Sequence, residues 1–247
     1  GGFPGDFIAQ TLEDSNIQSD FVQVDEDTRI NVKLKSGQET EINAPGPKVT
    51  HAQFEQLLSQ IRRTTNDDIV IVAGSVPNSI PSDAYAQIAQ ITEKTGAQLV
   101  VDAEKDLVET VLPYRPLFIK PNKDELEVMF NTTVKSDEDV IKYGKEILKK
   151  GAQSVIISLG GDGAIYVDQH QSIKAVNPQG HVVNTVGSGD STVAGMVAGL
   201  SMGLNIDEAF QQAVASGTAT AFSEDLATRD AIENIKSQVT ISVLDGE

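Results

Sequence analysis

The stretch Asp68-Ile-Val-Ile-Val-Ala73 is a short apolar run of β-branched residues, and a helix-like segment, Pro81 to Lys94, separates it from a second run, Ala97-Gln-Leu-Val-Val-Asp102. This order predicts a βαβ unit, whose two strands lie parallel. The same alternation continues over Glu104 to Leu112, Leu117 to Lys120, Asn122–Phe130, Asp137–Lys150 and Ser154 to Ser158. We therefore expect an α/β fold in which helices cover both faces of a mostly parallel central sheet.

Two regions depart from this alternation. Residues 21–43 alternate polar and apolar side chains around Ser36-Gly37, which predicts an exposed antiparallel β hairpin that forms a small lid. Its strands are expected over Phe21–Val24, Thr28–Leu34 and Gln38–Asn43. The C-terminal third is expected to hold three helices and a final strand, over Ser191–Met202, Asp207–Ala221, Asp230–Ser237 and Val239–Val243.

The composition indicates one globular domain over residues 1–247. With 39% hydrophobic residues the chain can bury a sizeable core, and the absence of cysteine excludes disulfide scaffolds and thiolate metal sites. Its 36 acidic and 19 basic residues give a formal net charge of −17. Because that charge repels nucleic acids and anionic membranes, neither is an expected partner. A phosphate site must be built locally, from helix N-termini, single basic side chains and a metal ion.

The start of the chain gives no sign of export. Residues Gly1-Gly2-Phe3-Pro4-Gly5 do not resemble a signal peptide, and no apolar run has the length of a membrane span. Together with the lack of cysteine, which is compatible with a reducing compartment, this leads us to expect a cytoplasmic protein. The chain begins without Met, so its start is interpreted as cut or processed.

The strongest local signal is Gly187-Ser-Gly-Asp190, which opens the predicted helix Ser191–Met202. Glycines let the backbone turn tightly and bring unpaired N–H groups of the helix start towards an anion. Asp190 would lie beside that anion, where it could take a proton from a hydroxyl group. Asp190 or Ser188 could equally cap the helix. On these four residues alone, a phosphate site and a plain helix cap both remain open.

Within the same predicted helix, Gly195 and Gly199 lie four residues apart. A glycine inside a helix costs roughly 1 kcal/mol relative to alanine unless another backbone packs closely against it. We expect tight packing beneath the glycine loop, for which ordinary packing of small residues is a sufficient explanation.

Two further segments carry polar residues at predicted strand ends, where ligands collect in such sheets. In Lys120-Pro-Asn-Lys-Asp-Glu125, residues Asn122 and Glu125 share a helix face and suit Mg²⁺, but they are equally typical of a capping box. Ser158-Leu-Gly-Gly-Asp-Gly163 leads directly into Ala164-Ile-Tyr-Val167, which predicts a strand, a turn and a second strand. That turn is either a plain hairpin turn or a glycine-lined bed for a nucleotide.

Together these segments resemble, in the same order, the PfkB branch of the ribokinase-like carbohydrate kinases. The most specific part is Asn184-Thr-Val-Gly-Ser-Gly-Asp-Ser-Thr-Val-Ala-Gly195, which is similar to the C-terminal signature of that family. Asn43-Ala-Pro-Gly-Pro47 is similar to the return from lid to core in its phosphofructokinase and tagatose-6-phosphate kinase group. The resemblance implies a ribokinase-like fold and ATP-dependent phosphorylation of a sugar phosphate, with fructose 1-phosphate as the first candidate and tagatose 6-phosphate as the alternative.

The resemblance also implies roles for individual residues. Asp190 would accept the proton of the attacking hydroxyl, and the N–H groups of Gly187, Ser188 and Gly189 would form an anion hole. The residues implied in binding ATP are Lys120, Asn122, Ser158, Leu159, Gly160, Gly161, Asp162, Gly163 and Gly189. Those implied in holding Mg²⁺ are Glu125 and Asn122. Those implied in binding the sugar phosphate are Arg29, Asn43, Ser75 and Asp190.

One departure from the family pattern concerns the start of the chain. Family members begin with an opening strand, further lid strands and a Gly-Gly-Lys-Gly-x-Asn substrate motif, a difference of at least roughly 30 residues. We expect an N-terminally incomplete member, which would bind sugar phosphate poorly. The alternative from another class is a non-catalytic protein that binds a nucleotide or a sugar phosphate. The exposed edge of the lid also predicts a homodimer.

Overall fold

The computed structural model describes residues 1–36 and 38–246, without the side chains of residues 35, 36 and 38–41. Within this part of the chain the main sheet has seven strands, in the order β3-β4-β5-β6-β7-β8-β9. Their bounds are β3 Ile69–Ala73, β4 Gln98–Asp102, β5 Phe118–Ile119, β6 Val155–Ser158, β7 Ala164–Val167, β8 Gln171–Val176 and β9 Thr240–Gly246.

Most strands of this sheet run in one direction. β3, β4, β5 and β6 are parallel to one another, whereas β7, β8 and β9 join the sheet through antiparallel pairings. β8 still runs in the direction of β6, because β7 is antiparallel to both. The expected α/β fold with a mostly parallel sheet is confirmed, and its antiparallel end makes the sheet a mixed one. Strand β8 had not been predicted from the sequence.

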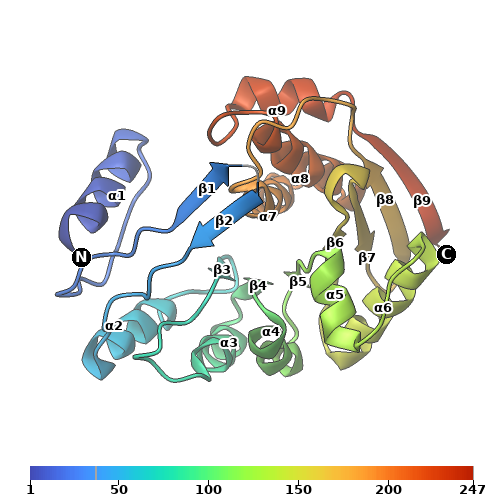
Figure 1. Cartoon of the computed structure of the whole chain (residues 1–247). Coiled ribbons are helices and arrows are strands. Elements are labelled where there is room, and N and C mark those ends of the chain that lie inside the picture. Colours follow the sequence, from blue (N-terminus) through green and yellow to red (C-terminus); the bar gives the residue numbers. More distant parts are fainter. Residues whose placement is uncertain (37, 247) are drawn as a thin grey trace.

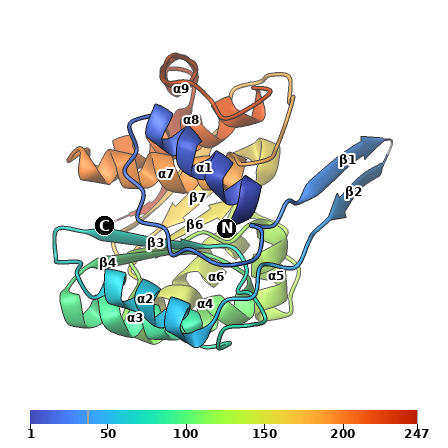
Figure 2. The ribbon, with the colours of Figure 1, turned by 90° about the vertical axis from the view of Figure 1, so that its left-hand side faces the viewer.

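Helices cover both faces of the sheet (Figure 1, Figure 2). One face carries α2 to α6, at His51–Ile61, Ala84–Thr95, Lys105–Val111, Lys123–Phe130 and Asp137–Lys150. The other carries α7, α8 and α9, at Ser188–Ser201, Ile206–Ala221 and Arg229–Lys236. No helix in the described part of the chain has the length and apolar character needed to cross a membrane.

The core consists of two apolar layers, one on each face of the sheet. Successive side chains of a strand point to opposite faces. Leu99 and Val101 of β4 pack into the layer formed with α2 to α6, and Val100 between them packs into the layer formed with α7 and α8. A nearly continuous apolar run such as Ala97 to Asp102 is therefore what a strand covered on both sides requires.

Helix α6 shows how local sequence sets the ends of an element. The Ser136 hydroxyl accepts a hydrogen bond from Asp139 N at 3.3 Å and caps the helix start. Acidic residues fill the first turn, Lys149 and Lys150 lie in the last, and this order complements the helix dipole. Gly151 follows with a φ of 134°. The predicted helix Asp137–Lys150 is confirmed at both ends.

The lid is a hairpin of two strands, β1 Val32–Ser36 and β2 Gln38–Ile42, which projects from the body of the molecule (Figure 2). Strand β2 begins at Gln38, as predicted, whereas β1 begins at Val32 rather than at Thr28. Residues 21–31 follow an irregular path, so the predicted strand at Phe21–Val24 is wrong. The turn that we expected at Gly37 lies outside the described residues.

The missing strand at Phe21–Val24 has a physical reason, because backbone carbonyl groups at and before this segment are bonded to helix α2. Gln60 Nε2 of helix α2 donates to Asp20 O at 2.7 Å, and Gln53 Nε2 donates to Gln23 O at 2.9 Å. A carbonyl group that accepts a side-chain donor from α2 is withdrawn from a strand ladder. Alternating side chains alone could not reveal this competition.

The N-terminal segment forms a helix, α1 Gly2–Asp14, which the sequence did not predict. Phe3 and Phe7 on it are 76% and 64% exposed, with their ring centroids 6.5 Å apart. Gly2, Pro4 and Gly5 lie in its first turn, and glycine and proline are the two residue types with the lowest helix propensity. The helix therefore lacks both the propensity and the buried apolar stripe from which helices are predicted.

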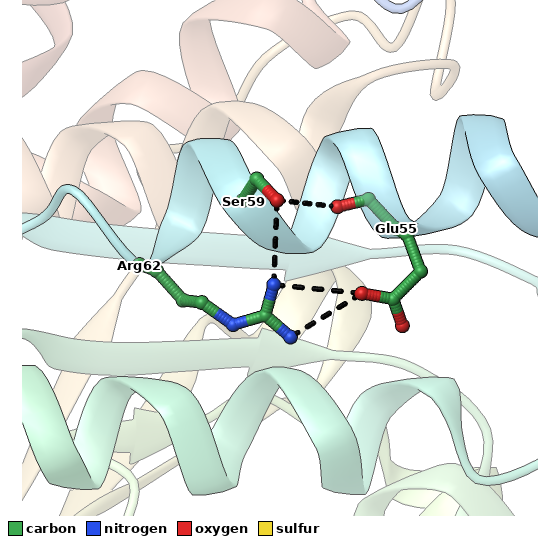
Figure 3. A network of polar contacts seen from close by, with 3 residues as sticks. All are labelled: Glu55, Ser59 and Arg62. Atoms are coloured by element: carbon green, nitrogen blue, oxygen red, sulfur yellow. Dashed lines mark hydrogen bonds and ion pairs between the residues drawn. The ribbon is translucent and has the colours of Figure 1, made fainter.

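The exposed face of α2 carries a small polar network (Figure 3). Arg62 donates to Ser59 Oγ at 3.3 Å and lies 3.4 Å from Glu55 Oε2, and Ser59 Oγ donates to Glu55 O at 2.8 Å. Because the two charged side chains are 50% and 42% exposed, water screens their attraction and the pair adds little stability. This face is ordinary solvated surface, in contrast to the strand ends described next.

Candidate active site

The carboxyl ends of three neighbouring strands form the floor of the candidate site. Gly74 follows β3, Asp102 ends β4 and Lys120 follows β5. Their backbones are tied together, since Gly74 N donates to Asp102 O at 3.0 Å and Lys120 N donates to Val101 O at 3.2 Å. The structure thus gathers polar residues at the edge where open α/β sheets bind ligands.

The glycine loop lies at the start of α7. Gly187 is the N-cap residue and has a φ of 79°, a conformation that favours glycine. The helix begins at Ser188 rather than at the predicted Ser191, so Gly189 and Asp190 belong to its first turn. N–H groups of a first turn have no acceptor within the helix and can face an anion. Asp190 is exposed at the same place.

One N–H group of this loop is already engaged. Ser188 N, which the resemblance assigns to the anion hole, donates to Thr185 O at 3.2 Å. The Ser188 hydroxyl oxygen is buried and has no hydrogen-bond partner within the part of the chain that the structure describes. The N–H groups of Gly187 and Gly189 are therefore better placed to receive an anion than that of Ser188.

Helix α7 is fixed by very close packing on α8. A Cβ atom added to Gly195 would lie 2.9 Å from Ala213 Cα, and one added to Gly199 would lie 2.8 Å from Ala209 Cα. At such distances any side chain would overlap the neighbouring backbone. The expected tight packing beneath the loop is confirmed, and it gives the start of α7 a fixed position.

A buried ion pair lies directly beneath this helix start. Lys120 Nζ is 3.2 Å from Asp102 Oδ2, and the two side chains are only 7% and 18% exposed. A Cβ atom on Gly189 would lie 3.3 Å from Lys120 Nζ, so the lack of a side chain lets the loop approach the ammonium group. The structure therefore brings Lys120, which is predicted to bind the nucleotide, next to the predicted glycine loop.

Asp102 was not selected as a site residue from the sequence. Burial raises the pKa of Asp102 above its usual range, the ammonium group of Lys120 lowers it, and the Asp190 carboxylate raises it further. Charges from β4, β5 and α7 thus act on one another. The available signal was an acidic residue at the end of a predicted strand, next to the strand that ends in Lys120.

Tyr85 supports the same floor from helix α3. Its hydroxyl group donates to Gly74 O at 2.8 Å and is shielded from solvent. Burial, and then the negative charge of Asp102, raise the pKa of Tyr85 to about 12. The hydroxyl group therefore stays a hydrogen-bond donor at neutral pH and holds the loop that follows β3.

The residues expected at the sugar phosphate lie on the lid and on the loop after β3. Ser75 is exposed in that loop, and Asn43 directly follows β2. The return from the lid lies against the β3 loop, because a Cβ atom on Gly46 would be 3.4 Å from Pro77 Cγ. Arg29 is exposed on the other leg of the lid. The structure thus brings the Asn43 segment to the Ser75 loop and leaves Arg29 facing solvent.

The expected metal ligands Asn122 and Glu125 form a capping box at the start of α5. Glu125 N donates to Asn122 Oδ1 at 2.8 Å, and Asn122 N donates to Glu125 Oε2 at 2.8 Å. Both residues line a cavity of 350 Å³ that is also bordered by Glu104, Asp106 and Asp124. Within the described residues no three acidic, histidine or cysteine side chains lie close enough together to hold a metal ion. The structure thus shows the capping box, and the metal role of the two residues stays a prediction.

The turn Ser158–Gly163 joins two strands, as predicted, through a 3₁₀ segment at Gly160–Asp162. Ser158 forms a parallel bridge with Asn122, so the turn lies beside the start of α5. A Cβ atom on Gly163, where φ is 94°, would overlap the Ala175 carbonyl oxygen. Glycine is therefore needed to close this turn, whatever the turn binds.

Comparisons with known proteins agree with this arrangement. The family described as pfkB family carbohydrate kinase matches residues 1–231. The 1-phosphofructokinase of Bacillus subtilis (strain 168) is 41% identical over 244 residues, which cover 99% of this chain and 80% of that protein. The D-tagatose-1-phosphate kinase of Bacillus licheniformis is 36% identical over 245 residues, which cover 99% of this chain and 81% of that protein.

The chain is also similar to a solved structure. A crystal structure from Staphylococcus aureus, provisionally described as that of a phosphofructokinase, has a TM-score of 0.92 at 80% sequence identity. It covers 100% of this chain, which in turn covers 81% of it. With the matched sheet, glycine loop and strand ends in place, the chain belongs to the pfkB family of carbohydrate kinases.

Proposed function

We propose that this chain transfers the γ-phosphoryl group of ATP to the 6-hydroxyl group of fructose 1-phosphate, which gives fructose 1,6-bisphosphate and ADP. The observation that carries the proposal is the convergence of Asp190, the first turn of α7 and the buried Lys120 at one edge of the sheet. They supply a base, an anion site and a cation, which phosphoryl transfer needs in fixed positions. The 41% identity with the B. subtilis 1-phosphofructokinase supports the choice of sugar.

Asp190 acts as the general base. It takes the proton of the 6-hydroxyl group while that oxygen forms a bond to the γ-phosphorus and the bond from γ-phosphorus to the bridging oxygen breaks, so that ADP leaves. Because Asp190 is exposed at the start of α7, a sugar can reach it from solvent. The dipole of α7 and the N–H groups of Gly187 and Gly189 face the charge of the transferred group.

Lys120 provides positive charge in a strongly acidic protein. Its ammonium group has three donors, and the contact with Asp102 at 3.2 Å accounts for one direction. Because Asp102 already neutralises the buried ammonium group, the protein can hold Lys120 in place before the nucleotide arrives. The polyphosphate would extend from Lys120 along the turn Ser158–Gly163, which lies beside Asn122.

Mg²⁺ fits the chemistry of this region as a companion of ATP, because it would neutralise part of the negative charge of the phosphate groups. The capping box uses one carboxylate oxygen of Glu125, which leaves the other for the ion or its waters. Mg²⁺ keeps several waters and takes few protein ligands, so it does not need a preformed cluster. We assign Glu125 as the principal contact and Asn122 as the residue that orients it.

The sugar phosphate is placed under the lid, between the Asn43 segment and the Ser75 loop. Arg29 would pair with the phosphate group at C1, because an exposed guanidinium group suits two phosphate oxygens at once. This end of the site is open, in keeping with a substrate that must enter and leave.

A coupled assay of ADP release tests the proposal. The chain with ATP and Mg²⁺ is given fructose 1-phosphate, tagatose 1-phosphate and tagatose 6-phosphate, and kcat/KM for the first should exceed the others by about tenfold or more. Tagatose differs from fructose only in the configuration at C4, and the 36% identity with a D-tagatose-1-phosphate kinase makes that sugar the second candidate. Binding of ATP without turnover on any sugar phosphate would favour the non-catalytic alternative.

We also propose that two copies of the chain associate through the lid. The register pairs Val32 with Ile42, and Leu34 lies on the same face of the hairpin because side chains alternate. These side chains are 41%, 55% and 49% exposed, and together they give the hairpin one apolar face. Sedimentation should show a dimer at micromolar concentration, and a monomer alone under those conditions would contradict this proposal.

A further inference from the structure

A cavity of 290 Å³ shares Leu159, Gly161 and Asp162 of the proposed nucleotide turn with the proposed active site, but neither Asp190 nor Lys120 lines it. Its walls come from the β6–β7 turn, the residues around the start of α6, the end of β8 and the first turn of α5. This volume is at the lower end of what ligand pockets usually have, so a ligand here would be small.

The cavity lies on the opposite face of the sheet from α7. In β8, Ile173 and Ala175 pack into the layer formed with α7 and α8. Lys174, between them, therefore points to the other face, and it lines the cavity together with Val140 of α6. The glycine loop and Asp190 stand on the α7 side, so a ligand in the cavity would not compete with the sugar phosphate.

The chemistry of the cavity suits a small anion with a carbon skeleton. Three lysines, Lys123, Lys135 and Lys174, line it beside two carboxylates, Asp137 and Asp162, so its lining is positive in a chain whose net charge is −17. Within the described residues Lys174 is held by Asp137 at 2.7 Å, whereas Lys123 and Lys135 form no ion pair. An arriving anion would supply these two ammonium groups with their counter-ion.

The floor beneath the lysines is apolar. Val134 and Val140 line the cavity and are only 3% and 2% exposed, and Leu159 borders it from the turn. Burial of such an apolar surface against carbon atoms of a ligand is favourable in free energy, whereas contact with a second charged group is not. The combination favours a phosphate monoester with a short carbon body over a polyphosphate.

The wall residue Asn177 connects the proposed nucleotide turn to helix α8. Asn177 Nδ2 donates to Gly160 O in the turn at 3.0 Å, and Asn177 Oδ1 accepts from Thr218 Oγ1 of helix α8 at 2.8 Å. A single side chain thus ties the turn to the helix that supports α7. A ligand that packs against Asn177 and the turn would hold both in place for the nucleotide.

We propose that this cavity is a second binding site, which takes a small phosphate monoester and raises the affinity of the chain for nucleotide. The binding itself does not depend on the proposed kinase activity, whereas its effect on the nucleotide rests on the proposed role of the turn Ser158–Gly163. By linkage, a bound nucleotide raises the affinity for the monoester by the same factor.

Calorimetry tests the binding. Glycerol 3-phosphate, with inorganic phosphate in a parallel titration, is added to the full chain saturated with a non-hydrolysable ATP analogue and fructose 1-phosphate. We expect one further site, whose affinity is about tenfold lower in Lys135→Glu. Lys149→Glu is the matched control, because Lys149 lies outside the cavity at the other end of α6 and is 70% exposed. Asp190→Asn should bind the probe like the wild type, which separates this site from the failure of catalysis.

The effect on nucleotide is measured separately. Saturating glycerol 3-phosphate should tighten ADP binding about fivefold in the wild type and leave it unchanged in Lys135→Glu. If Lys135→Glu binds the probe normally, the variant Lys135→Glu/Lys174→Gln decides, and normal binding there overturns the site. Absence of a further site on the saturated chain also overturns it, and binding of the probe without any change in ADP affinity overturns the regulatory part. A preference for inorganic phosphate over the monoester would overturn the assigned ligand class.

Discussion

The two ends of the proposed active site are built in different ways. At the phosphoryl-transfer end, the Lys120 side chain is 7% exposed and pairs with Asp102. Helix α7 there packs on α8 with backbone contacts at Gly195. At the sugar end, Leu34 of the lid is 49% exposed, and Arg29 and Ser75 are exposed as well. Packing in the core fixes the first end. The side chains of the second end are exposed and are available to a ligand or to another chain. The transfer chemistry is therefore a property of the core, and sugar recognition is a property of the surface.

The largest effect is expected at the base. Asp190→Asn should lower kcat by about 10²–10⁴-fold, because general base catalysis is lost, while ADP binding stays at the wild-type level. Asp207→Asn is the matched control, since Asp207 also lies in the first turn of a helix, α8, away from the site. The coupled assay and calorimetry with ADP give the two readouts. Near-normal turnover of Asp190→Asn would show that Asp190 is not the base, and the catalytic role proposed for the phosphoryl-transfer end would be lost.

The next effect tests whether the floor of the site depends on its buried charges. Asp102→Asn should lower the free energy of unfolding by about 3 kcal/mol, because the ammonium group of Lys120 is left without a counter-ion. Asp102→Asn/Lys120→Gln should be more stable than Asp102→Asn, since no unpaired charge remains buried. Urea denaturation measures both variants. A double variant less stable than the single one would show that the ion pair itself, and not the unpaired charge, dominates.

A smaller effect tests the packing of α7 on α8. Gly195→Ala should lower the free energy of unfolding by about 2 kcal/mol, because the added methyl group meets Ala213 Cα at 2.9 Å. Gly161→Ala is the control, since a Cβ atom there meets no described atom within 4 Å, and it should stay within about 0.5 kcal/mol of the wild type. Equal stability of the two variants in thermal or urea unfolding would mean that the helix pair adapts.

The smallest effect on folding is expected at the lid. Leu34→Ser should change the free energy of unfolding of the monomer by less than about 0.5 kcal/mol, because the side chain is half exposed. The same change should weaken the proposed dimer, which sedimentation detects as dissociation at a higher protein concentration. A strong loss of monomer stability would instead show that the lid contributes to the core, and the sugar end would then be built like the phosphoryl-transfer end.

The sequence predicted well those elements whose residues determine them locally. The runs Ala97–Asp102 and Ser154–Ser158 are apolar on both faces, as strands covered on both sides require. Helix α6 carries its own caps, at Ser136 and Gly151, and charged residues in its first and last turns. The glycines at 195 and 199 indicated the close helix pair, because glycine inside a helix needs such a reason.

The sequence failed where the outcome depends on residues distant along the chain. The segment before the lid alternates like a strand, yet Gln53 and Gln60 of α2 occupy its carbonyl groups. Asp102 gains its importance from Lys120, which reaches it only when β4 and β5 pair. The capping box of Asn122 shows a further limit, because a cap and a metal site use the same residue types.

The clamp between α7 and α8 has a consequence for motion during turnover. Helices whose backbones touch at Gly195 and Gly199 cannot slide or tilt against each other without breaking many contacts at once. The backbone that carries Asp190 is therefore held in place, and in the proposed mechanism the sugar is brought to it. In that mechanism we expect the hairpin β1–β2 to close over the sugar, and we expect its microsecond-to-millisecond movements, rather than the chemical step, to limit product release.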